Sequence, residues 1–342
     1  MSANIFSGLS RGVPGMGPRD MQAPASEFEE PDAIVASQTL AYQPDKLFLG
    51  MVGAKIERDG QTGERYAQGG TAIGVKTDQH AITIAGSRTG KGRAAIIPNM
   101  LCYQGSVLAI DPKGELALET AEVRADKLGQ RVVVLDPFGT TTDEQGRPKL
   151  PENYYSGFNP IALMRPKSMI EDAVLMTDAL VLPGAGDPHW DESARTIIEG
   201  VILEVATADR FKGRGSLVKV RDLLAEGESR DDPAVATLFD AGDGEEVTGM
   251  DVLEACMRES AEGAVRRAAA DFFERPDRER DSVLSTARRH LRALAFPEIA
   301  ASLSGAGFDL ADLKRSAMTV YLCLPGRHMG PCGRWRCGCR TR

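Results

Sequence analysis

The chain has 342 residues, of which 42% are hydrophobic and 26% charged. These values are typical of soluble globular proteins, so they exclude a wholly disordered chain, a collagen-like chain and a disulfide miniprotein. Lys and Arg total 41 against 49 Asp and Glu, and the net charge of −8 excludes a surface that is basic throughout, so any DNA contact must be local. Six cysteines without a regular framework indicate a reducing compartment.

The N-terminal segment, residues 1–45, mixes Pro, Ser, Glu and Gln with few aromatic residues, and we expect a flexible leader. It lacks the basic start and apolar core of a secretory signal. Elsewhere the sequence contains no run of about 20 apolar residues, the length that a membrane-spanning helix requires.

An α/β core is predicted to begin with a short β-rich run, Ile82-Thr83-Ile84-Ala85, followed by a glycine-containing loop. A helix is expected over 93–103, kinked or shortened by Pro98. The next predicted elements are a strand at 106–110, a helix at 115–128 closed by Gly129, and a strand at 131–135. Apolar, non-alternating strands that alternate with helices indicate a parallel sheet buried on both faces.

A mostly helical block follows the core. Helical spacing of apolar residues is found at 168–182, 188–206, 218–224, 250–259, 262–273 and 282–295. Asp187 is the expected N-cap of the second of these helices, with Pro188 in its first turn. Met318–Leu324 returns to a β-type run that we expect to rejoin the sheet, so the helical block is an insertion into the α/β core.

The segment Ala85–Gly92 has the features of a loop that cradles phosphate groups: a preceding strand, glycines, and a lysine at the start of a helix. It departs twice from the GxxxxGK[ST] pattern. Ala85 replaces the first glycine, and Gly92 replaces the hydroxyl residue that normally holds magnesium. On these residues alone, an ordinary strand-to-helix turn with an exposed lysine is the alternative.

The neighbouring motifs extend the pattern. They are Ile96-Ile97-Pro98-Asn99, Gly105 through Glu115, Gly129-Gln130-Arg131, Leu135 through Gly139, Phe158-Asn159-Pro160, Trp190 with Glu192 and Ala194, Phe308-Asp309-Leu310, and Tyr321 through Pro325. In this order the segment from Ala72 to Pro325 resembles the type IV secretion coupling proteins, ATPases that feed conjugative DNA or effectors into a secretion channel. Both departures in the phosphate loop fall within the pattern of that family.

The resemblance implies a RecA-like P-loop NTPase sheet with an inserted all-helical domain, a homo-hexamer, and the use of ATP with Mg²⁺. It implies single-stranded DNA, relaxase or effector cargo and the type IV secretion machinery as partners. The nucleotide-binding residues would be Gly86, Ser87, Arg88, Thr89, Gly90, Lys91, Gly92 and Arg93, with Lys91 on the outer phosphates. Asp111 and Glu115 are candidates for the edge of the site, although Asp111 is equally interpretable as a helix cap.

On this basis the chain divides into a leader at 1–45, a first part of the NTPase domain at 46–160, an all-helical domain at 161–300, a return to the NTPase domain at 301–325, and a tail at 326–342. The family's membrane helices are missing from this sequence, so we expect a cytoplasmic protein or one peripheral at the inner membrane.

Hydrolysis requires an acidic pair at the end of a further strand, the Walker B acids, and residues 326–342 contain no Asp or Glu. We therefore expect an incomplete sheet, a C-terminal truncation that removes part of the ring interface, and weak or absent turnover. The function indicated is a nucleotide-binding coupling protein impaired in hydrolysis. The alternative is a non-catalytic remnant that binds at most nucleotide or partners.

The tail holds Cys332, Cys337 and Cys339 and five arginines. Its abrupt change in composition favours a reading-frame shift near Gly326. The cysteine spacing fits no usual zinc site, and no metal site is predicted. We expect the other cysteines, Cys102, Cys256 and Cys323, in the core. Three arginines of one helix, Arg288, Arg289 and Arg292, are interpretable as a cargo or DNA stripe, as a solvated face, or as partners of acidic loops.

Overall fold

The computed structural model describes residues 30–63, 65–84, 86, 89–182, 187–231, 235, 247–305 and 307–328. The chain divides into two compact units, Met1–Thr83 and Ile84–Arg342. The predicted tail cysteines, most of the leader and the acidic loop at 240–246 lie outside the described residues.

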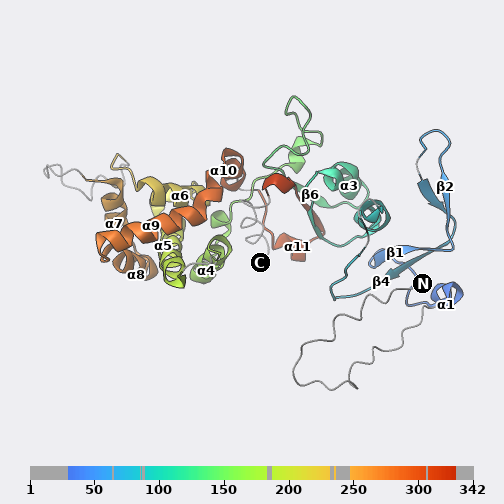
Figure 1. The fold of residues 1–342 in the computed structure, drawn as a ribbon, viewed down its shortest axis with the longest axis horizontal. Helices are drawn as coiled ribbons and strands as arrows, with labels where there is room; N and C mark the ends of the chain where they lie inside the picture. Colours follow the sequence, from blue (N-terminus) through green and yellow to red (C-terminus); the bar gives the residue numbers. More distant parts are fainter. Residues whose placement is uncertain are drawn as a thin grey trace, which may run out of the picture. The chain divides into compact units, whose positions relative to one another are not determined.

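The first unit consists of a short helix and two antiparallel pairs of strands (Figure 1). Its elements are α1 (Pro31–Ala36), β1 (Leu47–Val52), β2 (Lys55–Arg58), β3 (Arg65–Gln68) and β4 (Thr71–Val75). β1 pairs with β4, and β2 pairs with β3.

The described part of the predicted flexible leader, residues 30–45, belongs to this unit. Lys46 is 8% exposed, and its ammonium group donates to the carbonyl oxygens of Thr39 and Ala41 at 2.8 and 2.6 Å. Ala41 also forms a β-bridge to Ile73. The described end of the leader is therefore held by backbone contacts that its polar composition does not reveal.

The second unit contains a three-stranded parallel sheet of order β5-β7-β6. The strands are β5 (Val107–Ile110), β6 (Arg131–Leu135) and β7 (Met318–Leu322). β7 lies in the middle, where Leu322 is in register with both Ile110 and Leu135. The prediction that the late β-run rejoins a parallel sheet is confirmed.

Both faces of this sheet are buried, as the strand composition predicted. Along β6, Val133 and Leu135 belong to the core shared with the helical block. Val132 and Val134 face the opposite way into the core formed with α3 (Glu115–Asp126). This alternation follows from the two-residue period of a strand.

The expected strand at 82–85 is not formed in the part of it that the structure describes. Ile82 and Ile84 are 85% and 86% exposed. A β-branched run becomes a strand only when a neighbouring strand completes its hydrogen-bond ladder, and no described strand pairs with residues 82–84. After the loop the chain forms a π-helical turn, η1 (Gly92–Ile96), and then α2 (Ile97–Cys102) with Pro98 in its first turn, so the predicted irregular helix is confirmed.

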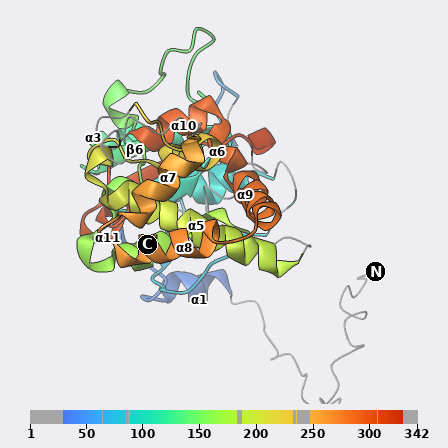
Figure 2. The same ribbon diagram turned by 90° about the vertical axis from the view of Figure 1, so that its left-hand side faces the viewer.

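The inserted helical block lies between β6 and β7 in sequence. Its helices are α4 (Met169–Leu180), α5 (Pro188–Thr207), α6 (Leu217–Glu226), α7 (Gly249–Arg258), α8 (Gly263–Phe273), α9 (Asp277–Leu291) and α10 (Pro297–Ser304). α5 is the central helix and packs against α4, α6, α8 and α9 (Figure 2). The Asp187 side chain accepts a hydrogen bond from the His189 backbone N–H, which confirms the predicted N-cap.

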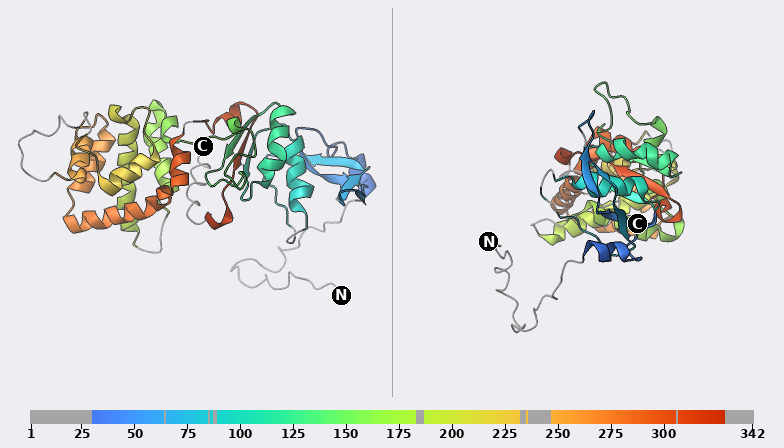
Figure 3. Two further views of the ribbon diagram at one scale, coloured as in Figure 1. Left: turned by 90° about the horizontal axis from the view of Figure 1, so that it is seen from above. Right: turned by 90° about the vertical axis from the view of Figure 1, so that its right-hand side faces the viewer.

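The remaining described helices are short connections. They are η2 (Glu152–Tyr154), η3 (Ile161–Leu163), η4 (Pro166–Ser168), η5 (Asp209–Phe211), η7 (Arg292–Ala295), α11 (Asp312–Arg315) and η8 (Gly326–His328). Figure 3 shows the helices of the inserted block, coloured green to orange, bundled together. The α/β class, the parallel sheet and the inserted helical block are thus confirmed.

The two segments that join the sheet to the helical block cross in close contact. The Phe158 backbone N–H donates to the Ser302 carbonyl oxygen at 2.7 Å, and the rings of Phe158 and Phe308 lie 5.6 Å apart between centroids. A Cβ atom on Gly157 would lie 2.7 Å from the Ser302 carbonyl oxygen and 2.8 Å from the Gly305 Cα atom. Only a residue without a side chain fits this crossing.

Gly157→Ala is expected to lower the free energy of unfolding by about 1–3 kcal/mol, because backbone atoms would have to move to admit the methyl group. Urea unfolding followed by circular dichroism measures the change. Gly263→Ala, at the start of α8, is the control, since its Cβ would meet only the ends of arginine side chains at 3.4 Å or more. Equal stability of the two variants would contradict the tight crossing.

Candidate functional site

In the candidate phosphate loop, two side chains hydrogen-bond to the same backbone atom, the carbonyl oxygen of Gly86. The Thr89 hydroxyl donates to this oxygen at 2.8 Å, and the Lys91 ammonium group donates to it at 2.7 Å. Gly90 has φ of +88°, a left-handed conformation that glycine adopts without strain. Of the predicted loop, Ser87 and Arg88 lie outside the described residues, and the structure brings Gly86, Thr89 and Lys91 together.

The loop leads directly into a helix N-terminus. Lys91 has α-helical φ and ψ and precedes η1, which begins at Gly92 and includes Arg93. The Ala94 N–H donates to the Gly90 carbonyl oxygen at 2.8 Å. Backbone N–H groups in the first turn of a helix have no intrahelical acceptor, and the helix dipole places positive charge there. A glycine turn, a lysine and a helix start therefore coincide at one point, which is the chemistry of an anion site.

Asp111, a candidate for the site edge, is hydrogen-bonded to the first turn of α3, whose N-cap residue is Gly114. Asp111 is 3% exposed, and its Oδ2 atom accepts a hydrogen bond from the Ala117 N–H at 2.9 Å. Burial raises the pKa of Asp111, although backbone N–H groups of the same turn oppose this shift. The sequence left a helix cap and a site residue open; the hydrogen bond from Ala117 fits the first, and the place of Asp111 at the edge of the site stays a prediction.

Glu115, the other edge candidate, is the first residue of α3. Its side chain is 64% exposed and forms an ion pair with Lys113 at 3.5 Å. Asp111 and Glu115 are thus held within the turn between β5 and α3, at the C-terminal edge of the sheet, where ligand sites of open α/β folds form.

A second turn lies at the same edge of the sheet. It belongs to the motif Leu135 through Gly139, where the sequence predicted no site. At the end of β6, Asp136 Oδ1 accepts from the Thr140 N–H at 2.8 Å, and Oδ2 accepts from the Thr141 N–H and hydroxyl at 2.6 and 2.7 Å. Gly114 has φ of +73°, and a Cβ there would lie 2.7 Å from the Thr141 side chain. The two Asp-Pro turns therefore interlock. The sequence signal for this pair of turns is that a strand is followed by Asp-Pro twice, at Asp111-Pro112 and at Asp136-Pro137.

Cys323 follows the central strand, between these two turns. Burial raises the pKa of its thiol, and the negative charges of Asp136 and Asp111 raise it further. The thiol thus stays protonated at neutral pH. Cys323 and Cys256 are buried as predicted, whereas Cys102 is exposed, because α2 ends at this residue and buries Met100 instead.

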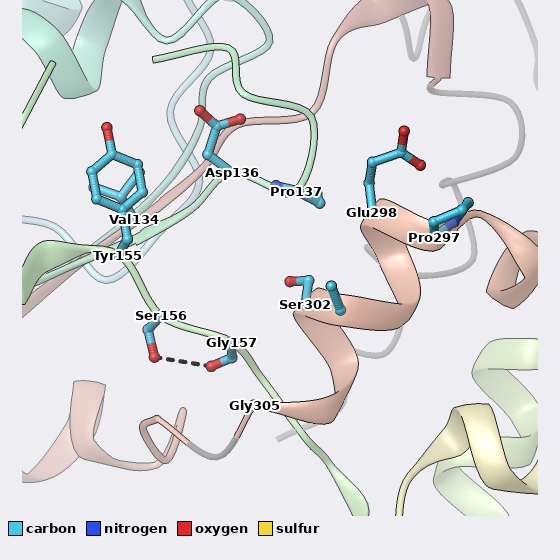
Figure 4. Close-up of a pocket in the computed structure, with 11 residues that line it drawn as sticks. Val134, Asp136, Pro137, Tyr155, Ser156, Gly157, Pro297, Glu298, Ser302 and Gly305 are labelled. Atoms are coloured by element: carbon cyan, nitrogen blue, oxygen red, sulfur yellow. Dashed lines mark hydrogen bonds between the residues drawn. The ribbon is translucent and has the colours of Figure 1, made fainter. Parts of the chain in front are cut away.

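A cavity of about 660 Å³ opens between the end of β6 and α10. Its lining residues are Val134, Asp136, Pro137, Tyr155, Ser156, Gly157, Pro297, Glu298, Ala301, Ser302 and Gly305. Figure 4 shows Glu298 and Ser302 on α10, facing the segments that carry Asp136 and Ser156. This cavity was not predicted, since it is formed by residues more than a hundred positions apart.

Within the part of the chain that the structure describes, no group of three or more His, Cys, Asp or Glu side chains is arranged to hold a metal ion. None of the described helices combines the length and apolar character needed to cross a bilayer.

Two of the predicted stripe arginines form hydrogen bonds inside the helical block. Arg288 donates to the carbonyl oxygens of Leu224 and Ala225, both at 2.8 Å. Arg289 donates to Asp191 at 3.1 Å. These contacts favour a structural role for both.

Residues 26–330 match the model of the family described as type IV secretory system conjugative DNA transfer. The chain belongs to this family. The resemblance to the type IV secretion coupling proteins is therefore confirmed.

Curated relatives of this family member include a conjugal transfer protein TraG of Escherichia coli, 27% identical over 242 residues, which cover 69% of this chain and 34% of that protein. Protein VirD4 of Agrobacterium fabrum is 27% identical over 258 residues, which cover 72% of this chain and 32% of that protein. The chain spans about a third of the length of the curated relatives it matches.

Among solved structures, the plasmid coupling protein TrwB in complex with ADP and Mg²⁺ is similar with 17% sequence identity and a TM-score of 0.36. The match covers 69% of this chain and 51% of that chain.

Proposed function

We propose that this chain is the nucleotide-binding part of a coupling protein that would use ATP to deliver conjugative DNA or effector substrates to a type IV secretion channel, and that its hydrolysis of ATP is impaired. One observation carries the proposal: Lys91 and Thr89 converge on the Gly86 carbonyl at the start of a helix, in a chain of the conjugative DNA transfer family. The names of the relatives, conjugal transfer proteins among them, support the cargo class.

The described loop fits a phosphate group. The Lys91 ammonium group needs only to exchange the Gly86 oxygen for a phosphate oxygen, which is a stronger acceptor because it is charged. ATP bound here would supply the phosphoryl group, while Gly90, Lys91 and Gly92 would bind and orient it. The loop fits Mg²⁺ less well, since Gly92 offers no side-chain oxygen as a ligand.

We further propose single-stranded DNA or a relaxase or effector as cargo, the type IV secretion machinery as partner, and a location in the cytoplasm or at the inner membrane. The domain division at 46–160, 161–300 and 301–325 is also proposed, with the first unit set apart up to Thr83. The family's hexamer is the assembly that a complete ring would form.

A second candidate, a non-catalytic module that binds nucleotide or partners, is favoured by the two carboxylates at the sheet edge. Asp111 and Asp136 both accept backbone hydrogen bonds that fix their turns. A carboxylate that polarises water or holds the metal shell needs its oxygen atoms for that purpose. We therefore expect little or no turnover from these residues.

Phosphate release from ATP, measured with and without single-stranded DNA, separates the two candidates. The expected result is release no faster in the wild-type chain than in Lys91→Ala. Turnover that DNA stimulates and that Lys91→Ala removes would contradict the expectation of weak hydrolysis and establish the motor.

A further inference from the structure

Arg124 on α3 is a fully buried cation. Its side chain has 0% relative exposure, and no carboxylate forms an ion pair with it among the described residues. Burial lowers the pKa of Arg124 below its ordinary value. Burying a charge without an ionic partner is costly unless hydrogen bonds replace the lost water. The hydrogen bonds of this guanidinium group therefore show which parts of the fold it stabilises.

Each of the guanidinium's N–H groups has an acceptor, and every acceptor is neutral. Nε donates to the Thr319 hydroxyl on β7, and Nη1 donates to the carbonyl oxygens of Met100 and, at 3.1 Å, Tyr103. Nη2 donates to the Gly105 carbonyl oxygen at 2.9 Å and to Gln130 Oε1 at 2.8 Å. A guanidinium group has five N–H donors in a fixed fork, and all of them are used here.

Three of these acceptors are backbone carbonyls at or just beyond the C-terminal end of α2. Met100 lies in the last turn, Tyr103 is the C-cap, and Gly105 follows in the loop to β5. Carbonyl groups at a helix C-terminus lack intrahelical donors and carry partial negative charge, so a cation satisfies them. Gln130 extends this network to one more carbonyl group of the same loop, because its Nε2 donates to the Gln104 carbonyl oxygen at 2.8 Å.

α2 depends on such an anchor more than a longer helix would. It has 6 residues, and the π-helical turn η1 precedes it directly after Lys91. A helix this short is not stable by its own hydrogen bonds and takes its orientation from tertiary contacts. Whatever fixes the end of α2 therefore fixes the direction in which Lys91 and the first helical turn face.

We propose that Arg124 is a positioning residue for the phosphate loop: it clamps the carbonyl end of α2 to α3 and β7 and so holds Lys91 and η1 ready for a phosphate group. The inference rests on the proposed nucleotide binding for its functional consequence, while the clamp itself concerns only the residues described. Lysine cannot replace Arg124, because one ammonium group cannot reach acceptors on opposite sides of a planar fork.

The test compares Arg124→Lys with Val283→Ala, a core variant on α9 in the helical block, after urea unfolding has shown how far each is destabilised. Amide hydrogen exchange of residues 92–103 is measured first, without nucleotide. We expect exchange at least about 10-fold faster in Arg124→Lys than in Val283→Ala at equal global stability. Equal exchange in this segment would overturn the clamp.

The dissociation constant for ADP is measured next, and we expect it to rise at least about 10-fold in Arg124→Lys and to stay within about 2-fold in Val283→Ala. Faster exchange with unchanged affinity would overturn the positioning role. If the wild-type chain binds no ADP, the proposed function and the positioning role fail, whereas the exchange result still decides the clamp. Should Arg124→Lys not fold, Thr319→Val removes the Nε acceptor, together with the bond that the same hydroxyl donates to Gln130 Oε1 at 2.7 Å, and is expected to shift exchange in the same direction by a smaller factor.

Discussion

Replacing Arg210 with methionine is expected to lower the free energy of unfolding by about 3–5 kcal/mol, because it leaves the buried Glu204 carboxylate without its cation and leaves Glu228 paired with Lys219 alone. Arg210 is 10% exposed and pairs with Glu204, which is 1% exposed, at 2.7 Å. It also pairs with Glu228, which is 2% exposed, at 3.4 Å. Lys219 reaches Glu228 at 3.1 Å but is 33% exposed and does not contact Glu204 in the ion pairs formed here.

The pKa of Arg210 reflects the same balance. Burial lowers it, the charges of Glu204 and Glu228 raise it, and the net result lies above the ordinary value. The cluster connects the end of α5 with η5 and the residues that follow α6. Its loss should therefore destabilise the helical block rather than one helix end.

Urea unfolding of Arg210→Met and Arg258→Met measures the difference. Arg258 pairs with Glu254 at 2.8 Å on the surface of α7, with side-chain exposures of 40% and 29%, and its loss should cost at most about 1 kcal/mol. Adding Glu204→Gln to Arg210→Met should recover part of the stability, because it removes a buried charge. Similar losses in the two single variants would show that the buried cluster is no more important than a surface pair.

Replacing Lys91 with alanine is expected to weaken ADP binding by about 10- to 100-fold, the range given by a hydrogen bond to a charged group. Lys91 is the cation that the Gly86 carbonyl holds beside the start of η1. Removing it leaves backbone N–H groups as the phosphate ligands. The loop's own hydrogen bond from Thr89 to Gly86 is unaffected, so the fold should remain.

Isothermal titration calorimetry at fixed salt gives the two dissociation constants, since surface charge effects vary with ionic strength. Lys113→Ala is the matched control: its side chain is 75% exposed and pairs with Glu115 outside the loop. Its affinity for ADP should stay within about 2-fold of the wild type. An equal loss in both variants would point to general electrostatic attraction rather than a site at Lys91.

The elements that depend on local pattern were predicted well. The apolar run at 131–135, the helix closed by Gly129 and the N-cap at Asp187 are each specified by a few neighbouring residues. The β-type run at 318–324 was predicted to rejoin the sheet, and residues 318–322 do so.

Features that depend on residues far apart in the sequence were missed or predicted wrongly. The composition of Ile82–Ile84 favours a strand, but composition does not say whether a partner strand lies beside it. Cys102 has an apolar neighbourhood in sequence, yet α2 ends there and leaves it exposed. The loop glycines and Lys91 carried a recognisable pattern, whereas the Arg124 acceptors are mostly backbone carbonyls, which every residue type offers alike.

The most direct test of nucleotide binding at the phosphate loop is amide hydrogen exchange of the wild-type chain with and without saturating ADP. Bound phosphate should slow exchange at residues 89–97, where the loop enters η1 and α2, and Lys91→Ala should lose this protection. Absence of protection there, or protection confined to the cavity between β6 and α10, would contradict a nucleotide site at Lys91.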